Sequence, residues 1–197
     1  MNTVPPVAVL IRHTCADFDR WKTAFDADEP NRKAAGMLGH HVNRGRENPN
    51  ELTVFIAASD LAKAQAFALS PELKATMQAA GITSQPEVTW MTPVSESLVW
   101  DRTLPAVIIT HKVADFAAWR AGYEKAETVR RTGGIVGHAV NRSNENPDEV
   151  IVYHQAETPE AVAAFASRPE LKAAMQEAGV TGAPSFRFVT GGWSRKY

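Results

Sequence analysis

Histidine and arginine recur at one fixed spacing in this 197-residue chain. Arg44 follows His40 by four residues, and Arg142 follows His138 by the same interval. On a β-strand, both members of such a pair share one face. A neutral histidine can take a proton from a phenol, and a neighbouring arginine can hold the resulting anion. We predict these four as the catalytic residues. The structural alternative is a hydrogen-bonded histidine and an arginine paired with a hairpin carboxylate such as Glu47.

A second group of residues has the chemistry to bind a substrate. His13 precedes Asp17 by four residues, and a His–Asp pair is one ingredient of general base catalysis. The same spacing suits a hydrogen-bonded corner between strand and helix. Asn43 could orient a carbonyl or satisfy backbone groups near a turn, and Trp21 could wall an aromatic pocket or belong to the core. With their equivalents later in the chain, the predicted substrate-binding residues are His13, His111, Asn43, Asn141, Trp21 and Trp119.

Metal and cofactor motifs are missing from the sequence. His40 and His41 are adjacent, so on a strand they point to opposite faces and do not chelate one ion together. The sequence contains neither HExxH nor a cysteine pair, since Cys15 is the single cysteine. It also lacks GxGxxG and GxxxxGK[ST], the motifs that cradle nucleotide phosphates. We therefore expect no metal, no haem and no nucleotide cofactor.

The charge balance excludes several classes of partner. With 21 basic and 22 acidic residues the net charge is −1, which gives no reason to expect nucleic acid or an anionic membrane. No apolar run approaches the roughly 20 residues that span a bilayer. The first six residues do not resemble a signal peptide. We expect a cytoplasmic protein whose partner is a small molecule.

The chain contains an internal repeat. A shift of 98 residues aligns residues 8–90 with residues 106–188 without a gap, and 36 of the 83 aligned positions are identical. Two copies are too few for a solenoid, so a duplicated domain or a fused dimer remains. We expect one repeat over residues 1–94, a linker over 95–105 and a second repeat over 106–197.

Each repeat predicts the element order βαββαβ. Asp17 and Ser70 are typical helix N-caps, Pro30 ends or bends the first helical region, and Gly81 ends the second. The last strand of the second repeat is expected at residues 186–189. The strands expected in the first repeat are residues 7–11, 37–45, 51–58 and 87–91.

The order βαββαβ is the ferredoxin-like motif, whose helices cover one face of the sheet. The other face would expose apolar surface at a cost of about 25 cal/mol per Å². We therefore predict an α+β fold of two tandem ferredoxin-like units packed sheet-to-sheet as an intramolecular dimeric α+β barrel. Fusion raises the effective concentration of the second unit, which favours a monomeric pseudo-dimer. A further homodimer stays open.

This arrangement resembles the dimeric α+β barrel superfamily, in particular its antibiotic-biosynthesis-monooxygenase-like branch. The resemblance covers residues 7–91 and 105–190. Besides the element order, it rests on the pattern His13-x3-Asp17-Phe18-x2-Trp21 and on the segment Ser70-Pro71-Glu72-Leu73-Lys74. It implies an aromatic substrate between sheet and helices, oxidised by dioxygen through a carbanion without a cofactor. The Asn, Trp, Tyr and Arg site residues of those monooxygenases do not align one by one with this chain.

Two functions follow as hypotheses. The first is a cofactor-independent monooxygenase or cyclase-like enzyme that acts on an aromatic or polyketide-like compound. The second is a non-catalytic ligand-binding or stress-associated barrel protein, in which the histidines and arginines are structural. An apolar cavity of several hundred Å³ with converging polar groups would favour the enzyme.

Overall fold

A computed structural model describes residues 4–197. The predictions for the first six residues and for the start of the first repeat therefore lie partly outside the described residues. The chain divides into two compact units. We call residues 4–91 with Gly192–Tyr197 unit 1, and Thr92–Gly191 unit 2. Within residues 4–197, no helix has the length and apolar character needed to cross a membrane.

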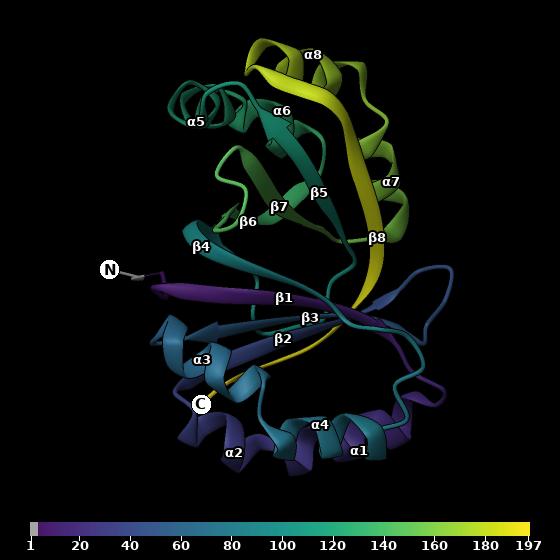
Figure 1. Cartoon of the computed structure of the whole chain (residues 1–197). Helices are drawn as coiled ribbons and strands as arrows, with labels where there is room; N and C mark the ends of the chain where they lie inside the picture. Colours follow the sequence, from purple (N-terminus) through teal and green to yellow (C-terminus); the bar gives the residue numbers. More distant parts are fainter. Residues whose placement is uncertain (1–3) are drawn as a thin grey trace. The chain divides into compact units, whose positions relative to one another are not determined.

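The first repeat contains four strands and four helices (Figure 1). In chain order they are β1 (Val7–Thr14), α1 (Phe18–Ala27), α2 (Glu29–Ala34), β2 (Met37–Gly45), β3 (Glu51–Ala58), α3 (Leu61–Ala68), α4 (Pro71–Ala79) and β4 (Glu87–Ser97).

The second repeat has the same elements in the same order. They are β5 (Ala106–Val113), α5 (Phe116–Lys125), α6 (Glu127–Thr132), β6 (Ile135–Ser143), β7 (Glu149–Ala156), α7 (Pro159–Ala166), α8 (Pro169–Glu177) and β8 (Val180–Lys196).

The predicted caps start the helices in the structure. The Asp17 carboxylate accepts a hydrogen bond from the Arg20 N–H at 2.7 Å, and the Ser70 hydroxyl accepts one from the Leu73 N–H at 3.1 Å. Each satisfies a backbone donor that the first helical turn leaves free. In the second repeat, the Asp115 carboxylate caps α5 in the same way, since it accepts a hydrogen bond from the Ala118 N–H.

The first helical region breaks in both repeats, although only the first contains a proline there. Pro30 lies at the start of α2, whereas the second break occurs at Ala126 without one. In both repeats a buried arginine bonds a carbonyl at the break: Arg32 donates to Phe25 O and Arg130 to Tyr123 O. The arginine satisfies an acceptor that the interrupted helix leaves free, so it supports the break in both repeats.

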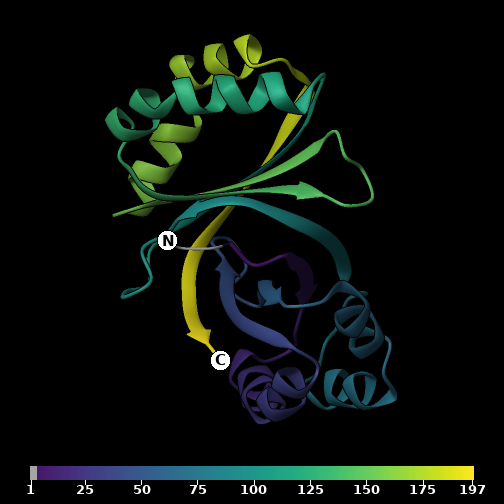
Figure 2. The same ribbon diagram turned by 90° about the vertical axis from the view of Figure 1, so that its left-hand side faces the viewer.

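Helices cover one face of the strands within each unit (Figure 2). In unit 1, alternate residues of the strands pack under α1 to α4 around the buried Trp21. In unit 2, Trp119 occupies the same position in α5. Period-two alternation of the strands therefore decides which side chains reach the space beneath the helices.

The strands form one closed hydrogen-bonded order, β1-β3-β2-β8-β5-β7-β6-β4. Two strands contribute to both units. β4 pairs with β1 in unit 1 from Glu87 to Met91 and continues into unit 2, and β8 pairs with β5 in unit 2 and then enters unit 1 at Gly192. There the Tyr197 N–H donates to Leu38 O of β2 at 3.0 Å.

The predicted fold class is confirmed: the fold is α+β, with eight antiparallel strands in a ring built from two repeats. The hairpin strands lie at residues 37–45 and 51–58, as predicted. The last strands run further than expected, because β4 reaches Ser97 and β8 spans Val180–Lys196. Part of the segment expected as linker is therefore strand.

Gly192 is the position where β8 enters unit 1. A Cβ at this residue would overlap the carbonyl of Val42 on β2. We expect Gly192→Ala to lower the free energy of unfolding by about 1–3 kcal/mol, the usual cost of overpacking, because the end of β8 must move away from β2. Urea denaturation measures the change. Ser185→Ala, an exposed position on β8, should stay within about 0.5 kcal/mol of wild type. Equal midpoints for the two variants would contradict the close contact.

Candidate functional site

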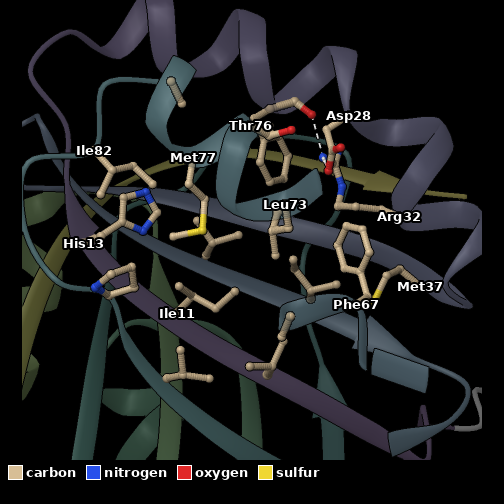
Figure 3. Close-up of a pocket in the computed structure, with 18 of the residues that line it drawn as sticks. Ile11, His13, Asp28, Arg32, Met37, Phe67, Leu73, Thr76, Met77 and Ile82 are labelled. Carbon is tan, nitrogen blue, oxygen red and sulfur yellow. Dashed lines mark hydrogen bonds and ion pairs between the residues drawn. The ribbon is translucent and has the colours of Figure 1, made fainter. Parts of the chain in front are cut away.

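Unit 1 contains a cavity of about 290 Å³ between its helices and its strands (Figure 3). Its wall is mostly apolar and aromatic, with contributions from all four strands and all four helices of the first repeat. Few polar side chains interrupt it. The residues on which the chemistry of the cavity depends are His13, Trp21, Phe25, Asp28, Arg32 and Met77.

His13, on β1, is the histidine in this wall. Its side chain is buried, at 6% exposure, and stands against the Trp21 ring with centroids 5.6 Å apart. Neither of its ring nitrogens has a hydrogen-bond partner. Burial lowers the pKa of His13 to about 4, so the imidazole is neutral at pH 7. A neutral imidazole offers one acceptor nitrogen and one N–H donor.

Asp28 and Arg32 form the polar side of the cavity. In Figure 3 they lie across the cavity from His13. Their closest charged atoms, Arg32 Nη1 and an Asp28 carboxylate oxygen, are 3.6 Å apart, and both side chains are almost fully buried. Arg32 also lies over the Phe25 ring, 3.8 Å from its centroid. Its Nη2 is buried without a hydrogen-bond partner, so one donor stays available at this side of the cavity.

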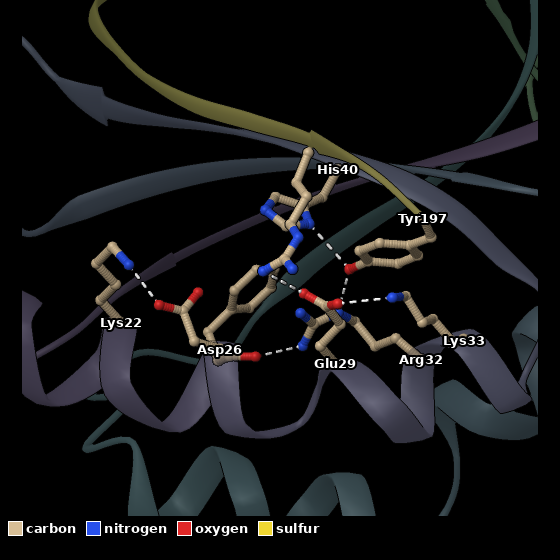
Figure 4. Close-up of polar contacts among 9 residues, drawn as sticks. Lys22, Asp26, Glu29, Arg32, Lys33, His40 and Tyr197 are labelled. Atoms are coloured by element: carbon tan, nitrogen blue, oxygen red, sulfur yellow. Dashed lines mark hydrogen bonds and ion pairs between the residues drawn. The ribbon is translucent and has the colours of Figure 1, made fainter.

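Tyr197, near the end of β8, connects Arg32 with His40 (Figure 4). Arg32 Nε donates to the Tyr197 hydroxyl at 2.7 Å, and this hydroxyl lies 2.9 Å from His40 Nδ1. Because Arg32 only donates, the Tyr197 oxygen accepts this bond; which partner donates between the tyrosine O–H and His40 Nδ1 depends on the tautomer of the imidazole. Burial, then the charge of Arg32, lowers the pKa of His40 to about 4.

The four predicted catalytic residues lie outside the walls of both described cavities. His40 uses its Nδ1 for the hydrogen bond with Tyr197. Arg44 donates to Pro49 O at 2.7 Å within the hairpin and lies 3.8 Å from the Phe18 ring centroid; Arg142 makes the equivalent contacts in unit 2. The His138 ring meets the edge of Tyr123. The catalytic roles of these residues stay predictions.

The predicted substrate-binding residues separate into two groups. His13 and Trp21 line the cavity of unit 1, and His111 and Trp119 line a cavity in unit 2. The asparagines point to the other face of the sheet: Asn43 is buried there, and Asn141 Nδ2 donates to Ile151 O at 3.5 Å. His13 does not pair with Asp17, because the carboxylate caps α1 instead.

The cavity of unit 2 measures about 40 Å³, one-seventh of its counterpart. A volume of this size holds about one water molecule. His154 and Tyr123 contribute to its wall, with the Tyr123 hydroxyl 3.1 Å from His154 Nε2. Burial raises the pKa of Tyr123 and holds the pKa of His154 well below its usual value, so both are neutral at pH 7.

Sequence reasoning missed several residues of the site. Asp28 and Phe25 lie one and two helical turns before Arg32. This spacing places the three side chains on one face of a helix, so the sequence could have indicated that they lie together. No pattern in the residues around Tyr197 could have indicated its role, because it lies beside β2 only through the pairing of the end of β8 with that strand. Within residues 4–197, no three histidine, cysteine or acidic side chains converge as metal ligands would.

The buried histidine predicts a pH dependence of stability. Between pH 6.5 and about 4, the unfolded chain protonates His13 and the folded chain does not, so the free energy of unfolding falls as the pH falls through this window. We expect His13→Leu to lose about 2 kcal/mol less stability than wild type between pH 7 and pH 5. Urea denaturation at the two pH values measures the difference. Identical losses would show that His13 is protonated equally in both states.

The two buried arginines provide a matched comparison. Arg32 faces Asp28, whereas the equivalent of Asp28 beside Arg130 is Ala126. Arg32→Met leaves a buried carboxylate without its cation, and Arg130→Met does not. We expect the first to cost about 1–3 kcal/mol more in the free energy of unfolding, which urea denaturation of both variants measures. An Asp28→Asn background should reduce the excess to the part that comes from the hydrogen bond between Arg32 and Tyr197; an unchanged excess would contradict a contribution of the ion pair.

Comparisons with known proteins agree with this architecture. No family model matches the chain, and no curated protein matches it in sequence. Solved structures do match. A "putative monooxygenase" from Lactobacillus acidophilus NCFM is 13% identical, with 98% of this chain and 96% of that chain covered at a TM-score of 0.67. An anthrone oxidase-like protein is 15% identical, with 96% and 92% covered at 0.69.

A third match is a ferredoxin fold protein related to antibiotic biosynthesis monooxygenases, from Listeria monocytogenes 4b F2365. It is 8% identical, and the match covers 94% of this chain and 95% of that chain at a TM-score of 0.55. Identities this low show a shared fold and no shared reaction. Because each match covers nearly all of both chains, this chain shares its fold with all three structures over both repeats.

Proposed function

We propose that unit 1 binds a fused-ring aromatic compound with a phenolic or enolic hydroxyl and oxidises it with dioxygen. The observation that carries this proposal is the neutral, unpartnered His13 in an otherwise apolar cavity of about 290 Å³. A buried polar group without a partner is costly. A ligand hydroxyl that bonds to it removes this cost, and an apolar ring system fills the rest of the cavity.

The size and polarity of the cavity support this ligand class. A cavity of about 150 Å³ lined by apolar side chains accepts benzene. Unit 1 offers about twice that volume, which suits two or three fused rings. His13 on one side would bond a hydroxyl, and Arg32 Nη2 on the other would donate to a carbonyl oxygen. The Trp21 and Phe25 rings, which stack with centroids 4.8 Å apart, provide an aromatic wall.

The proposed chemistry needs no reductant other than the substrate. His13 takes the hydroxyl or ring C–H proton, and the guanidinium of Arg32 stabilises the negative charge on the enolate oxygen. The electron-rich carbanion transfers electrons to dioxygen, and a carbon–oxygen bond forms. Loss of water from the peroxide converts the CH₂ into a carbonyl: one oxygen atom enters the product and the other leaves as water. The anthrone oxidase-like match agrees with a substrate of this class.

One observation favours the second candidate, a ligand-binding protein without catalysis. A general base is usually oriented by a hydrogen bond to its second nitrogen, and both nitrogens of His13 lack such a partner. Its pKa of about 4 also makes it a weak base. In that case the same contacts hold the ligand, and it leaves unchanged.

Oxygen consumption with 1,8-dihydroxyanthrone and with dihydroxynaphthalenes tests the proposal, after subtraction of the uncatalysed rate. We expect His13→Leu to lower the rate by about 10²-fold or more, the usual contribution of a general base. His111→Leu is the matched control, because His111 has the same 6% exposure and the same lowered pKa in unit 2. It should keep the wild-type rate.

The outcomes separate the candidates. Binding without oxygen consumption in wild type would leave the ligand-binding function and remove the enzyme. Equal rates for wild type and His13→Leu would remove His13 as the base. A rate loss in His40→Phe alone would instead assign the base to the histidine that bonds Tyr197.

A further inference from the structure

The two cavities occupy aligned positions of the repeats but differ sevenfold in volume. Many lining residues are unchanged across the 98-residue shift: Trp21 and Trp119, Leu73 and Leu171, and Met77 and Met175 are identical pairs. The conserved side chains therefore do not explain the difference. A few exchanges at neighbouring positions must close the cavity of unit 2.

The aligned pair Phe67 and Phe165 takes two positions. Phe67 on α3 is half-buried and lines the open cavity of unit 1 (Figure 3). Phe165 on α7 has 0% exposure and belongs to the core of unit 2, with its ring 5.1 Å from that of His154. The aligned phenylalanine therefore lines the open cavity in unit 1 and occupies core space in unit 2.

Gly133 leaves room for the Phe165 ring in unit 2. A Cβ at Gly133 would lie 2.6 Å from Phe165 Cδ2, so no other residue fits there while the ring stays inside. The aligned residue in unit 1 is Ala35. The two backbones agree closely, with φ −78° and ψ 4° at Ala35 against φ −82° and ψ 3° at Gly133. The backbone dihedral angles thus allow an alanine, and the closest contact of its Cβ would be with the Phe165 ring, followed by the Val129 carbonyl oxygen at 2.9 Å.

A second glycine brings two helices of unit 2 together. A Cβ at Gly122 on α5 would lie 2.9 Å from the Cβ of Ala178, which follows α8. Unit 1 has Ala24 and Ala80 at these positions, so α1 and the end of α4 need more space there. Gly122 and Ala178 both line the cavity of unit 2, so their close contact narrows that cavity.

His154 fills more of the space. It replaces Ile56, is buried at 3% exposure, and lies between Tyr123 and Phe165. Its bond to the Tyr123 hydroxyl satisfies one ring nitrogen. The aromatic group Tyr123, His154 and Phe165 thus occupies the volume that is empty in unit 1.

We propose that the duplicated chain has one ligand site per molecule, because Gly133 admits Phe165 into the cavity of unit 2 as a plug and Gly122 lets α5 approach the end of α8, whereas Ala35 and Ala24 keep the cavity of unit 1 open. This rests on the proposed function only in placing the ligand in unit 1. The plug itself is a property of unit 2 and is tested separately.

The two cavities carry built-in reporters, since Met77 lines one and Met175 the other. We choose 1-naphthol as probe and the ¹³C-labelled methionine methyl groups as signals in NMR spectra. In wild type, 1-naphthol should shift the Met77 methyl signal and leave that of Met175 unchanged. In Gly122→Ala/Gly133→Ala, which installs the residues of unit 1, the Met175 signal should also shift, with a Kd within about tenfold of that at Met77.

A control separates the plug from general loosening. Val140→Ala removes a fully buried side chain of unit 2 that does not line the cavity, so Met175 should stay silent. If the double alanine variant fails to fold, Phe165→Ala removes the plug directly and should make Met175 responsive.

Three results would overturn the proposal: a Met175 shift in wild type, a silent Met175 in the folded double variant or in Phe165→Ala, or a Met175 shift in Val140→Ala. A silent Met77 in wild type together with a responsive Met175 in the double variant would support the plug and contradict the proposed binding function in unit 1. The failures of the two proposals are therefore distinguishable.

Discussion

The pairing of β2 with the end of β8 is the constraint on which unit 1 depends. β2 is the last strand in the order β4-β1-β3-β2, and an unpaired edge exposes backbone donors and acceptors. The end of β8, which begins in unit 2, pairs with that edge through close backbone contacts at Gly192 and a hydrogen bond from Tyr197 to Leu38. Tyr197, the residue that follows β8, connects Arg32 and His40. The strand that closes the ring therefore also brings in a polar group that bonds Arg32 beside the cavity.

The internal duplication separates residues needed by the fold from residues available for function. Both repeats keep a capping aspartate, a tryptophan under the helices and an arginine that bonds the carbonyl at the helix break. These contacts also occur in unit 2, whose cavity has room for about one water molecule and therefore for no ligand. Their presence in both repeats thus indicates a role in the fold. The candidate function depends on what differs, above all on the small residues that decide where one phenylalanine ring lies.

Burial has two consequences for the polar groups of the cavity. It keeps His13 neutral, because the charged form loses its hydration, and it makes the missing hydrogen bonds of His13 and Arg32 expensive. A ligand that supplies those bonds gains more there than in water. The proposed preference for an aromatic compound with oxygen at both ends follows from the same low polarity that lowers the pKa of His13.

Local patterns in the sequence determined the repeat, the element order and the caps, because each depends on residues close together in the chain: Asp17 and Ser70 begin helices, and the turn around Pro49 joins two strands. Period two also placed His40 and Arg44 on one face of β2. Tertiary structure alone decided that Tyr197 bonds His40, that Asp17 leaves His13 unpaired, and that Phe165 fills a space which Phe67 leaves open. Those outcomes depend on contacts between residues that lie far apart in the chain, such as Tyr197 with His40, and on the space that a single Cβ atom would need. Neither can be recognised from the spacing of neighbouring residues.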